Sequence, residues 1–257
     1  MFINEKIIYL ALHKTGCTHV LKLLTSIPDF NGKIIGKHNK ISNVAKDELG
    51  DLSKKIKSGN VRNPWDWYVS LWAFGCMKKG GLYEQIIEKN ALRKLRHPLA
   101  FLTPVKKWRK VYSDAENPQL FRQWLEMLLC SRRKDMIHFG EAHVPRIMGF
   151  MTYRYLELYS FGFQKEMKNL KSIQQIKQFD SEHNFIDHFI YNENLDNDFK
   201  SLMMKTGIRE DVLNDVLKIS KTNFSLRKHY HDYYDESTKQ LVREKEMLII
   251  EKHKYDF

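Results

Sequence analysis

Residues 13–19, His-Lys-Thr-Gly-Cys-Thr-His, combine side chains that bind anions with a glycine that allows a tight turn. Lys14 supplies an ammonium group, Thr15 and Thr18 supply hydroxyl groups, and Gly16 supplies conformational freedom. At the start of a helix, such residues would present backbone N–H groups where the helix dipole favours negative charge. The pattern predicts a phosphate or sulfate site. A capped turn with a solvated Lys14 is the alternative.

The flanking residues predict a strand before this turn and a helix after it. Residues 6–12 form a short apolar run rich in β-branched side chains, which is typical of a buried parallel strand. Val20, Leu21, Leu23 and Leu24 then begin an apolar helical face. The nucleotide-binding P-loop, G-x-x-x-x-G-K-[ST], does not match, because here the lysine precedes the single glycine.

A second group of polar residues stands where another expected strand, residues 57–61, meets a helix. Pro64 suits the first turn of a helix, and an apolar stripe at helical spacing follows it: Trp65, Tyr68, Val69 and Trp72. Arg62 precedes this helix and Ser70 lies about two turns into it. A guanidinium and a hydroxyl so placed can hold one phosphate between them.

The Lys-Thr-Gly turn, followed by Arg-Asn-Pro and a serine eight residues after the arginine, resembles the sulfotransferase family. Those enzymes use 3′-phosphoadenosine 5′-phosphosulfate as sulfuryl donor. The resemblance implies that the 5′-phosphosulfate is bound by Lys14, Thr15, Gly16, Cys17 and Thr18. It implies that Arg62 and Ser70 hold the 3′-phosphate. The Arg-Lys-Gly loop of the phenol and steroid branch is missing, which favours the carbohydrate and bacterial branch.

His38 is the expected catalytic base. Residues 33–35 predict a second strand that ends near Lys37 and His38, and the resemblance places a catalytic histidine there. Imidazole can accept a proton near neutral pH. Lys14 is the second expected catalytic residue, because its ammonium can stabilise charge on the leaving phosphate. A solvated surface histidine is the alternative for His38, and a glutamate base stays open.

The remaining chain alternates predicted helices with one more strand. Residues 41–52 predict a short helix capped by Ser42, residues 184–190 a strand, and residues 193–203 a helix. Asp235 is expected to cap a last helix over residues 236–253. Residues of about 80–181 predict a helical insertion that shapes the acceptor side, and residues 223–229 could close over the nucleotide.

The composition points to an anionic ligand and to a reducing compartment. The chain has 43 Lys and Arg residues against 31 Asp and Glu, a net charge of +12, which attracts anions. It carries no nucleic-acid-binding signature, no metal-ligand spacing and no apolar run long enough for a membrane span. Three widely spaced cysteines make a disulfide framework unexpected, which favours the cytoplasm. The abundance of Lys, Ile and Asn suggests a bacterial source.

These observations predict a single α/β domain over residues 1–257, with a P-loop-like central parallel sheet flanked by helices. The resemblance implies transfer of a sulfuryl group to a hydroxyl on a carbohydrate or glycolipid, which can itself be anionic, without a metal. Two alternatives are a P-loop-type kinase and a non-catalytic polyanion-binding protein on the same fold. The oligomeric state and the acceptor are open.

Overall fold

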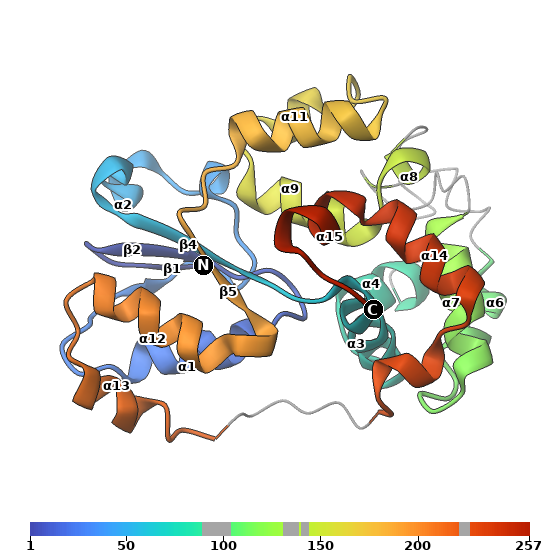
Figure 1. Cartoon of the computed structure of the whole chain (residues 1–257), viewed down its shortest axis with the longest axis horizontal. Coiled ribbons are helices and arrows are strands. Elements are labelled where there is room, and N and C mark those ends of the chain that lie inside the picture. Colours follow the sequence, from blue (N-terminus) through green and yellow to red (C-terminus); the bar gives the residue numbers. More distant parts are fainter. Residues whose placement is uncertain (89–103, 131–138, 140–143, 221–226) are drawn as a thin grey trace. The chain divides into compact units, whose positions relative to one another are not determined.

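The computed structural model describes residues 1–88, 104–130, 139, 144–220 and 227–257 (Figure 1). The chain divides into two compact units. The first unit comprises Met1–Arg62, Arg154–Phe163 and Asp180–Phe224. The second comprises Asn63–Tyr153, Gln164–Phe179 and Ser225–Phe257. The expected insertion at about 80–181 falls largely in the second unit, and the single-domain organisation stays a prediction.

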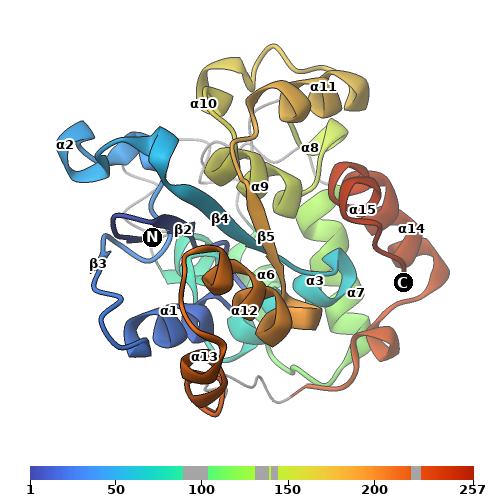
Figure 2. The ribbon, with the colours of Figure 1, turned by 60° about the vertical axis from the view of Figure 1, so that its left-hand side comes forward.

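The first unit is built on a five-stranded open sheet in the order β3-β1-β2-β4-β5. The strands are β1 (Phe2–Ile3), β2 (Ile7–Leu10), β3 (Lys33–Ile34), β4 (Ile56–Val61) and β5 (His188–Tyr191). β4 pairs in parallel with β2 and with β5 and lies between them (Figure 2). β1 pairs antiparallel with β2 and β3. The expected mixed α/β fold with a mostly parallel centre is therefore confirmed, whereas β1 was not expected.

Helices α1 (Cys17–Ser26), α12 (Leu195–Lys205) and α13 (Glu210–Val216) cover one face of this sheet. Their apolar side chains form one core with those of β1, β2 and β5, including Tyr9, Val20, Ile190 and Phe199. The all-apolar strand β2 is completely buried, as a central parallel strand must be. The strand, turn and helix predicted at the N-terminus are confirmed, as is the helix near residue 195.

The opposite face of β4 is covered by the end of α9 (Phe150–Tyr159). The Tyr159 ring lies so close to Gly59 that a Cβ on Gly59 would approach its Cε1 to 2.6 Å. Gly59 pairs with Leu10, which alternates with the core residue Tyr9 and so faces away from α1 and α12. The sheet thus has helices on both faces, as expected from the sequence.

Residues 41–52 do not form the single helix that was predicted. They contain η1 (Ile41–Asn43), α2 (Lys46–Leu49) and the start of η2 (Leu52–Lys54). The N-cap of η1 is Lys40, so Ser42 lies inside that turn and does not cap it. Gly50, with a positive φ of 60°, ends α2 before a longer helix can form.

The second unit is an assembly of helices with an aromatic core. The described helices that lie in it are α3 (Pro64–Cys76), α4 (Gly81–Tyr83), η3 (Glu84–Glu88), α6 (Val105–Val111), α7 (Pro118–Leu129), α8 (Val144–Ile147), η6 (Tyr230–Tyr233), α14 (Glu236–Lys245) and α15 (Met247–His253). Helices α10 (Phe163–Glu166) and α11 (Ile173–His183) each span a boundary between the units. The predicted stripe of α3 is buried, and Asn63 caps this helix by accepting from the N–H of Trp65 at 3.0 Å.

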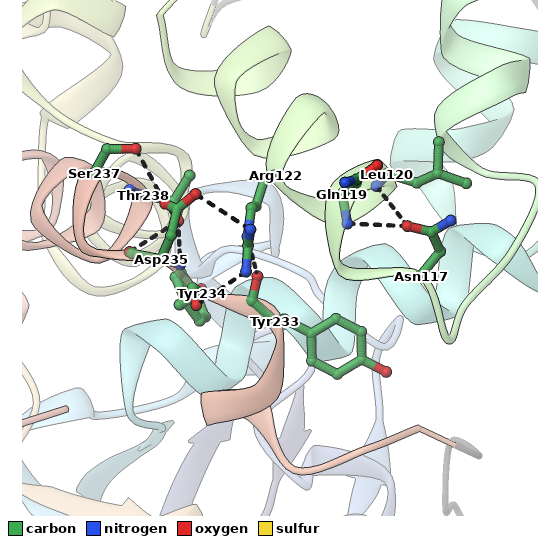
Figure 3. Close-up of polar contacts among 9 residues, drawn as sticks. All are labelled: Asn117, Gln119, Leu120, Arg122, Tyr233, Tyr234, Asp235, Ser237 and Thr238. Atoms are coloured by element: carbon green, nitrogen blue, oxygen red, sulfur yellow. Dashed lines mark hydrogen bonds and ion pairs between the residues drawn. The ribbon is translucent and has the colours of Figure 1, made fainter.

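The expected last helix is divided into two. Asp235 does cap α14 through a capping box with Thr238, and Arg122 of α7 donates to the carbonyls of Tyr233 and Tyr234 beside it (Figure 3). At Glu246, however, α14 ends and α15 begins. Glu246 is completely buried, and its carboxylate accepts hydrogen bonds from neighbouring residues. These contacts fix the backbone where the helix is interrupted.

Candidate functional site

The turn between β2 and α1 has the backbone that its sequence suggested. Lys14 and Gly16 both have positive φ values, 62° and 77°. Glycine adopts this region without steric cost, whereas a lysine there is strained and must be held by its surroundings. Gly16 is the N-cap of α1, so no cap side chain covers the first N–H groups of this helix.

Asn60 of β4, and Arg62 just after β4 ends, donate side-chain hydrogen bonds to carbonyl groups of this turn. Arg62 Nη1 donates to the Lys14 carbonyl at 2.9 Å, and Asn60 Nδ2 donates to the Thr15 carbonyl at 3.2 Å. In a trans peptide the N–H points opposite to the C=O. The N–H groups of Thr15 and Gly16 therefore point away from the β4 side chains that hold the carbonyls. The turn is oriented to present donors.

Asn60 is a residue that sequence reasoning missed. It is buried on β4, its side-chain oxygen accepts from Tyr9, and its backbone N–H donates to the Tyr159 hydroxyl at 2.9 Å. Burial raises the pKa of both tyrosines well above 10, so both stay protonated. An amide side chain among the small residues of this strand end, Ser-Gly-Asn-Val, was the available signal.

The other turn residues contribute through their backbone more than through their side chains. The Thr15 hydroxyl donates to the Leu12 carbonyl at 2.8 Å, which closes the turn. The Cys17 side chain is buried in the apolar core, and burial raises the pKa of its thiol. Thr18 is partly exposed in the first turn of α1. Cys17 can therefore offer only its N–H to a ligand, whereas Thr18 can also offer a hydroxyl.

His38 lies beside the same turn. Its Nδ1 is 2.6 Å from the carbonyl oxygen of Ala11, the residue that follows β2 by one. A carbonyl can only accept, so Nδ1 carries the proton and Nε2 carries the lone pair. Burial lowers the pKa of His38 to about 4, partly opposed by this hydrogen bond and reinforced by Lys37 and Arg154. His38 is therefore neutral at pH 7 and holds a basic nitrogen.

Arg154, to which the sequence analysis gave no role, acts electrostatically on both His13 and His38. Arg154 and Glu157 of α9 form an ion pair, and Lys40 binds the same carboxylate at 2.8 Å. Arg154 Nη2 also lies 3.5 Å from His13 Nδ1. Because Glu157 is buried and paired with two cations, it serves to hold them in place. The spacing of Arg154 and Glu157, three residues apart on one helix, gave no specific signal.

The expected site residues thus fall into two groups. Lys14, Thr15, Gly16, Cys17, Thr18, His38 and Arg62 all belong to the first unit. Direct hydrogen bonds join Arg62 and His38 to residues 11–14. Ser70 lies buried on α3 in the second unit. Its pairing with Arg62 around one phosphate therefore stays a prediction. Of residues 223–229, those up to 226 lie outside the described residues, and Arg227 is ion-paired with Asp66.

The first-unit group is chemically suited to an oxyanion. An ammonium, a guanidinium and backbone N–H groups are all donors, and charged partners strengthen such hydrogen bonds. Phosphate and sulfate groups are the ligand class that such donors recognise, and His38 lies beside the same turn. No group of three or more His, Cys, Asp or Glu side chains within the described residues is arranged to hold a metal.

Comparison with known proteins gives a negative result. No family model, no curated protein and no solved structure matches the chain. Within the described part of the chain, no helix is both long and apolar enough to cross a membrane.

Proposed function

We propose that this chain is a sulfotransferase that uses 3′-phosphoadenosine 5′-phosphosulfate and transfers its sulfuryl group to a hydroxyl on a carbohydrate or glycolipid. The observation that carries the proposal is the convergence of three separate segments. His38 binds the Ala11 carbonyl and Arg62 binds the Lys14 carbonyl, so the base and the second motif meet at the turn of the first motif. This supports a P-loop-like anion site.

The chain's residues have distinct roles in the proposed reaction. When bound, the donor supplies a sulfuryl group whose sulfur bonds to the acceptor oxygen, while the bond to the bridging phosphate oxygen breaks and leaves its electron pair there. His38 Nε2 takes the acceptor proton. Lys14 and the N–H groups of the turn stabilise the negative charge that grows on phosphate. The acceptor class, the cytoplasmic location and the bacterial source stay predictions.

The first experiment measures thermal unfolding with 3′-phosphoadenosine 5′-phosphate, with magnesium-ATP as a separate arm. At 100 times its dissociation constant, a ligand stabilises the folded state by about 2.7 kcal/mol. For a chain of this size, that is a rise of roughly 5–10 °C. We expect the rise with the bisphosphate alone. A rise with magnesium-ATP alone would favour the kinase, and affinity only for generic polyanions would favour the binding protein.

Variants locate the effect at the proposed site. Arg62→Ala should abolish the shift, whereas Arg209→Ala, an exposed arginine of the same unit paired with Asp211, should leave it unchanged. Lys14→Asn suits the positive φ at this position while removing the ammonium. Lys14→Asn should lower the rate of sulfuryl transfer from labelled donor roughly 10²–10³-fold. Near-normal transfer by Lys14→Asn would reject the role given to Lys14.

A further inference from the structure

Two histidine rings stack beside the turn. His13, in the turn after β2, and His38, in the segment after β3, have ring centroids 3.5 Å apart and an angle of 21° between their planes. This is van der Waals contact between nearly parallel imidazoles. The two residues are 25 positions apart in the sequence, and His13 takes no part in the proposed transfer step.

The partners of the two rings fix opposite tautomers. His38 Nδ1 must carry a proton because it faces the Ala11 carbonyl at 2.6 Å. His13 Nδ1 must carry a lone pair because it faces the Arg154 guanidinium, which can only donate. The neutral pair therefore has its basic nitrogens at Nε2 of His38 and Nδ1 of His13. Arg154 occupies the second of these, so only His38 Nε2 is suited to receive a proton.

The surrounding charges oppose double protonation. Arg154 and Lys37 act on both rings, the N-terminal amine acts on His38, and His38 acts on His13. Burial lowers the pKa of both histidines. The nearby carboxylate of Glu157 is paired with Arg154 and Lys40, which limits how far it can stabilise an imidazolium. Two like charges 3.5 Å apart in a partly buried site cannot both form at ordinary pH.

We propose that His13 is a positioning residue for the His38 base, and that the two stacked imidazoles act as one unit that binds a single proton, on Nε2 of His38. The proposal rests on the sulfotransferase function for its catalytic meaning. In the transfer step the acceptor O–H bond breaks, its electron pair forms the bond to sulfur, and its proton goes to His38 Nε2. An anionic donor bound nearby raises the affinity of that nitrogen for the proton.

The direct test is a long-range proton–nitrogen NMR correlation spectrum of the full chain labelled with ¹⁵N-histidine. In the wild-type protein near pH 7, His38 should be the Nδ1–H tautomer and His13 the Nε2–H tautomer. Of these two rings, only His38 should titrate on acidification before the protein unfolds. The proposed pairing of His13 and His38, called the dyad below, would be overturned if His38 were the Nε2–H tautomer. It would also be overturned if both rings titrated independently near pH 6.5. These readouts need no variant and no substrate.

Variants then separate positioning from mere packing. Arg154→Met removes a cation that faces both rings, so the pKa of the pair should rise by roughly one unit. Arg209→Met is the control, and it should leave both rings unchanged. His13→Phe keeps an aromatic ring in the stack. It should retain the thermal shift with 3′-phosphoadenosine 5′-phosphate while lowering kcat roughly 10-fold or more and moving the acid limb of its pH profile.

The outcomes distinguish the two proposals. If NMR shows the expected tautomers and a single titration in the His13–His38 pair, but 3′-phosphoadenosine 5′-phosphate does not bind, the dyad is supported and the sulfotransferase function is rejected. If the bisphosphate binds and transfer proceeds, but His13→Phe has a wild-type kcat and pH profile, the sulfotransferase function stands and the positioning role of His13 is rejected.

Discussion

At the residue scale, the orientation of two peptide groups decides whether the turn can bind an anion. The carbonyls of Lys14 and Thr15 are held by Arg62 and Asn60, so the attached N–H groups face the other way. Arg62 therefore has a structural contact in addition to its proposed phosphate contact, which a guanidinium with five N–H donors can sustain. Replacing Arg62 would therefore remove both its hydrogen bond to the Lys14 carbonyl and its proposed contact with phosphate.

Gly16 gives a prediction that a matched glycine can control. Gly16 and Gly207 both have positive φ, 77° and 84°. A Cβ on Gly16 would lie 2.7 Å from Leu195 Cδ1 and 2.9 Å from Asn192 Oδ1, whereas at Gly207 it would meet nothing within 4 Å. Gly207→Ala should cost about 1 kcal/mol of unfolding free energy from backbone strain alone. Gly16→Ala should cost a further 1–3 kcal/mol, roughly, from overpacking.

Urea denaturation of both variants measures this difference. Equal destabilisation by the two substitutions would mean that α12 does not pack tightly on the turn.

At the element scale, the end of β4 organises the site. Asn60 and Arg62 are two residues apart, so their side chains point to the same side of the strand and both reach the turn after β2. β2 and β4 are parallel neighbours, which brings their carboxyl ends to one edge of the sheet. Ligands of open parallel sheets bind at such edges.

The cap of α14 is a second element-scale feature. The Asp235 side chain accepts from the Thr238 N–H at 2.9 Å and also pairs with Arg122 at 3.4 Å (Figure 3). Asp235→Ala should cost about 1 kcal/mol, because the first turn loses its acceptor. Asp235→Asn keeps an acceptor and loses only a partly exposed ion pair, so its cost should be within a few tenths of a kcal/mol.

Chemical denaturation of these two variants separates capping from charge. If Asp235→Asn is as destabilising as Asp235→Ala, the ion pair with Arg122 carries the effect and the cap does not.

At the scale of the whole molecule, the buried carboxyl of Glu246 makes stability depend on pH. Glu246 accepts hydrogen bonds from Tyr68, from the Thr152 side chain at 2.6 Å and from two backbone N–H groups. Burial nevertheless raises its pKa from 4.5 to about 7, because desolvation outweighs these donors. A raised pKa means that the folded chain binds this proton more tightly than the unfolded chain.

Stability therefore falls as the pH rises through the interval between the unfolded and folded pKa values of Glu246. The contribution of Glu246 is fully present below pH 4.5 and is lost as the pH rises to about 7, on the order of 3 kcal/mol in total. The difference in unfolding free energy between wild type and Glu246→Gln should therefore change across this range. Glu244→Gln, at an exposed neighbour, is the control and should show no such change. A pH-independent difference for Glu246→Gln would contradict the prediction.

Much of the fold could be predicted from local patterns. The buried strand before Lys14, the helix after Gly16, the helix that begins at Pro64 and the cap at Asp235 all follow from short-range propensity and side-chain chemistry. Lys14, His38 and Arg62 were singled out by type and position, and hydrogen bonds join Arg62 and His38 to residues 11–14, but their functional roles stay predictions. The interruption at Glu246 could not be predicted, because a helical pattern continues through it and only buried partners stabilise the break.

By itself, the sequence determined the residue types available for chemistry and the strand–turn–helix units that carry them. Both are local properties of a chain segment. Only the tertiary structure decided that His38 stacks on His13, that Asn60 and Arg62 hold the turn, and that Arg154 faces the same rings. These contacts join segments far apart in the chain. Their formation depends on sheet order and helix packing, which no single segment encodes.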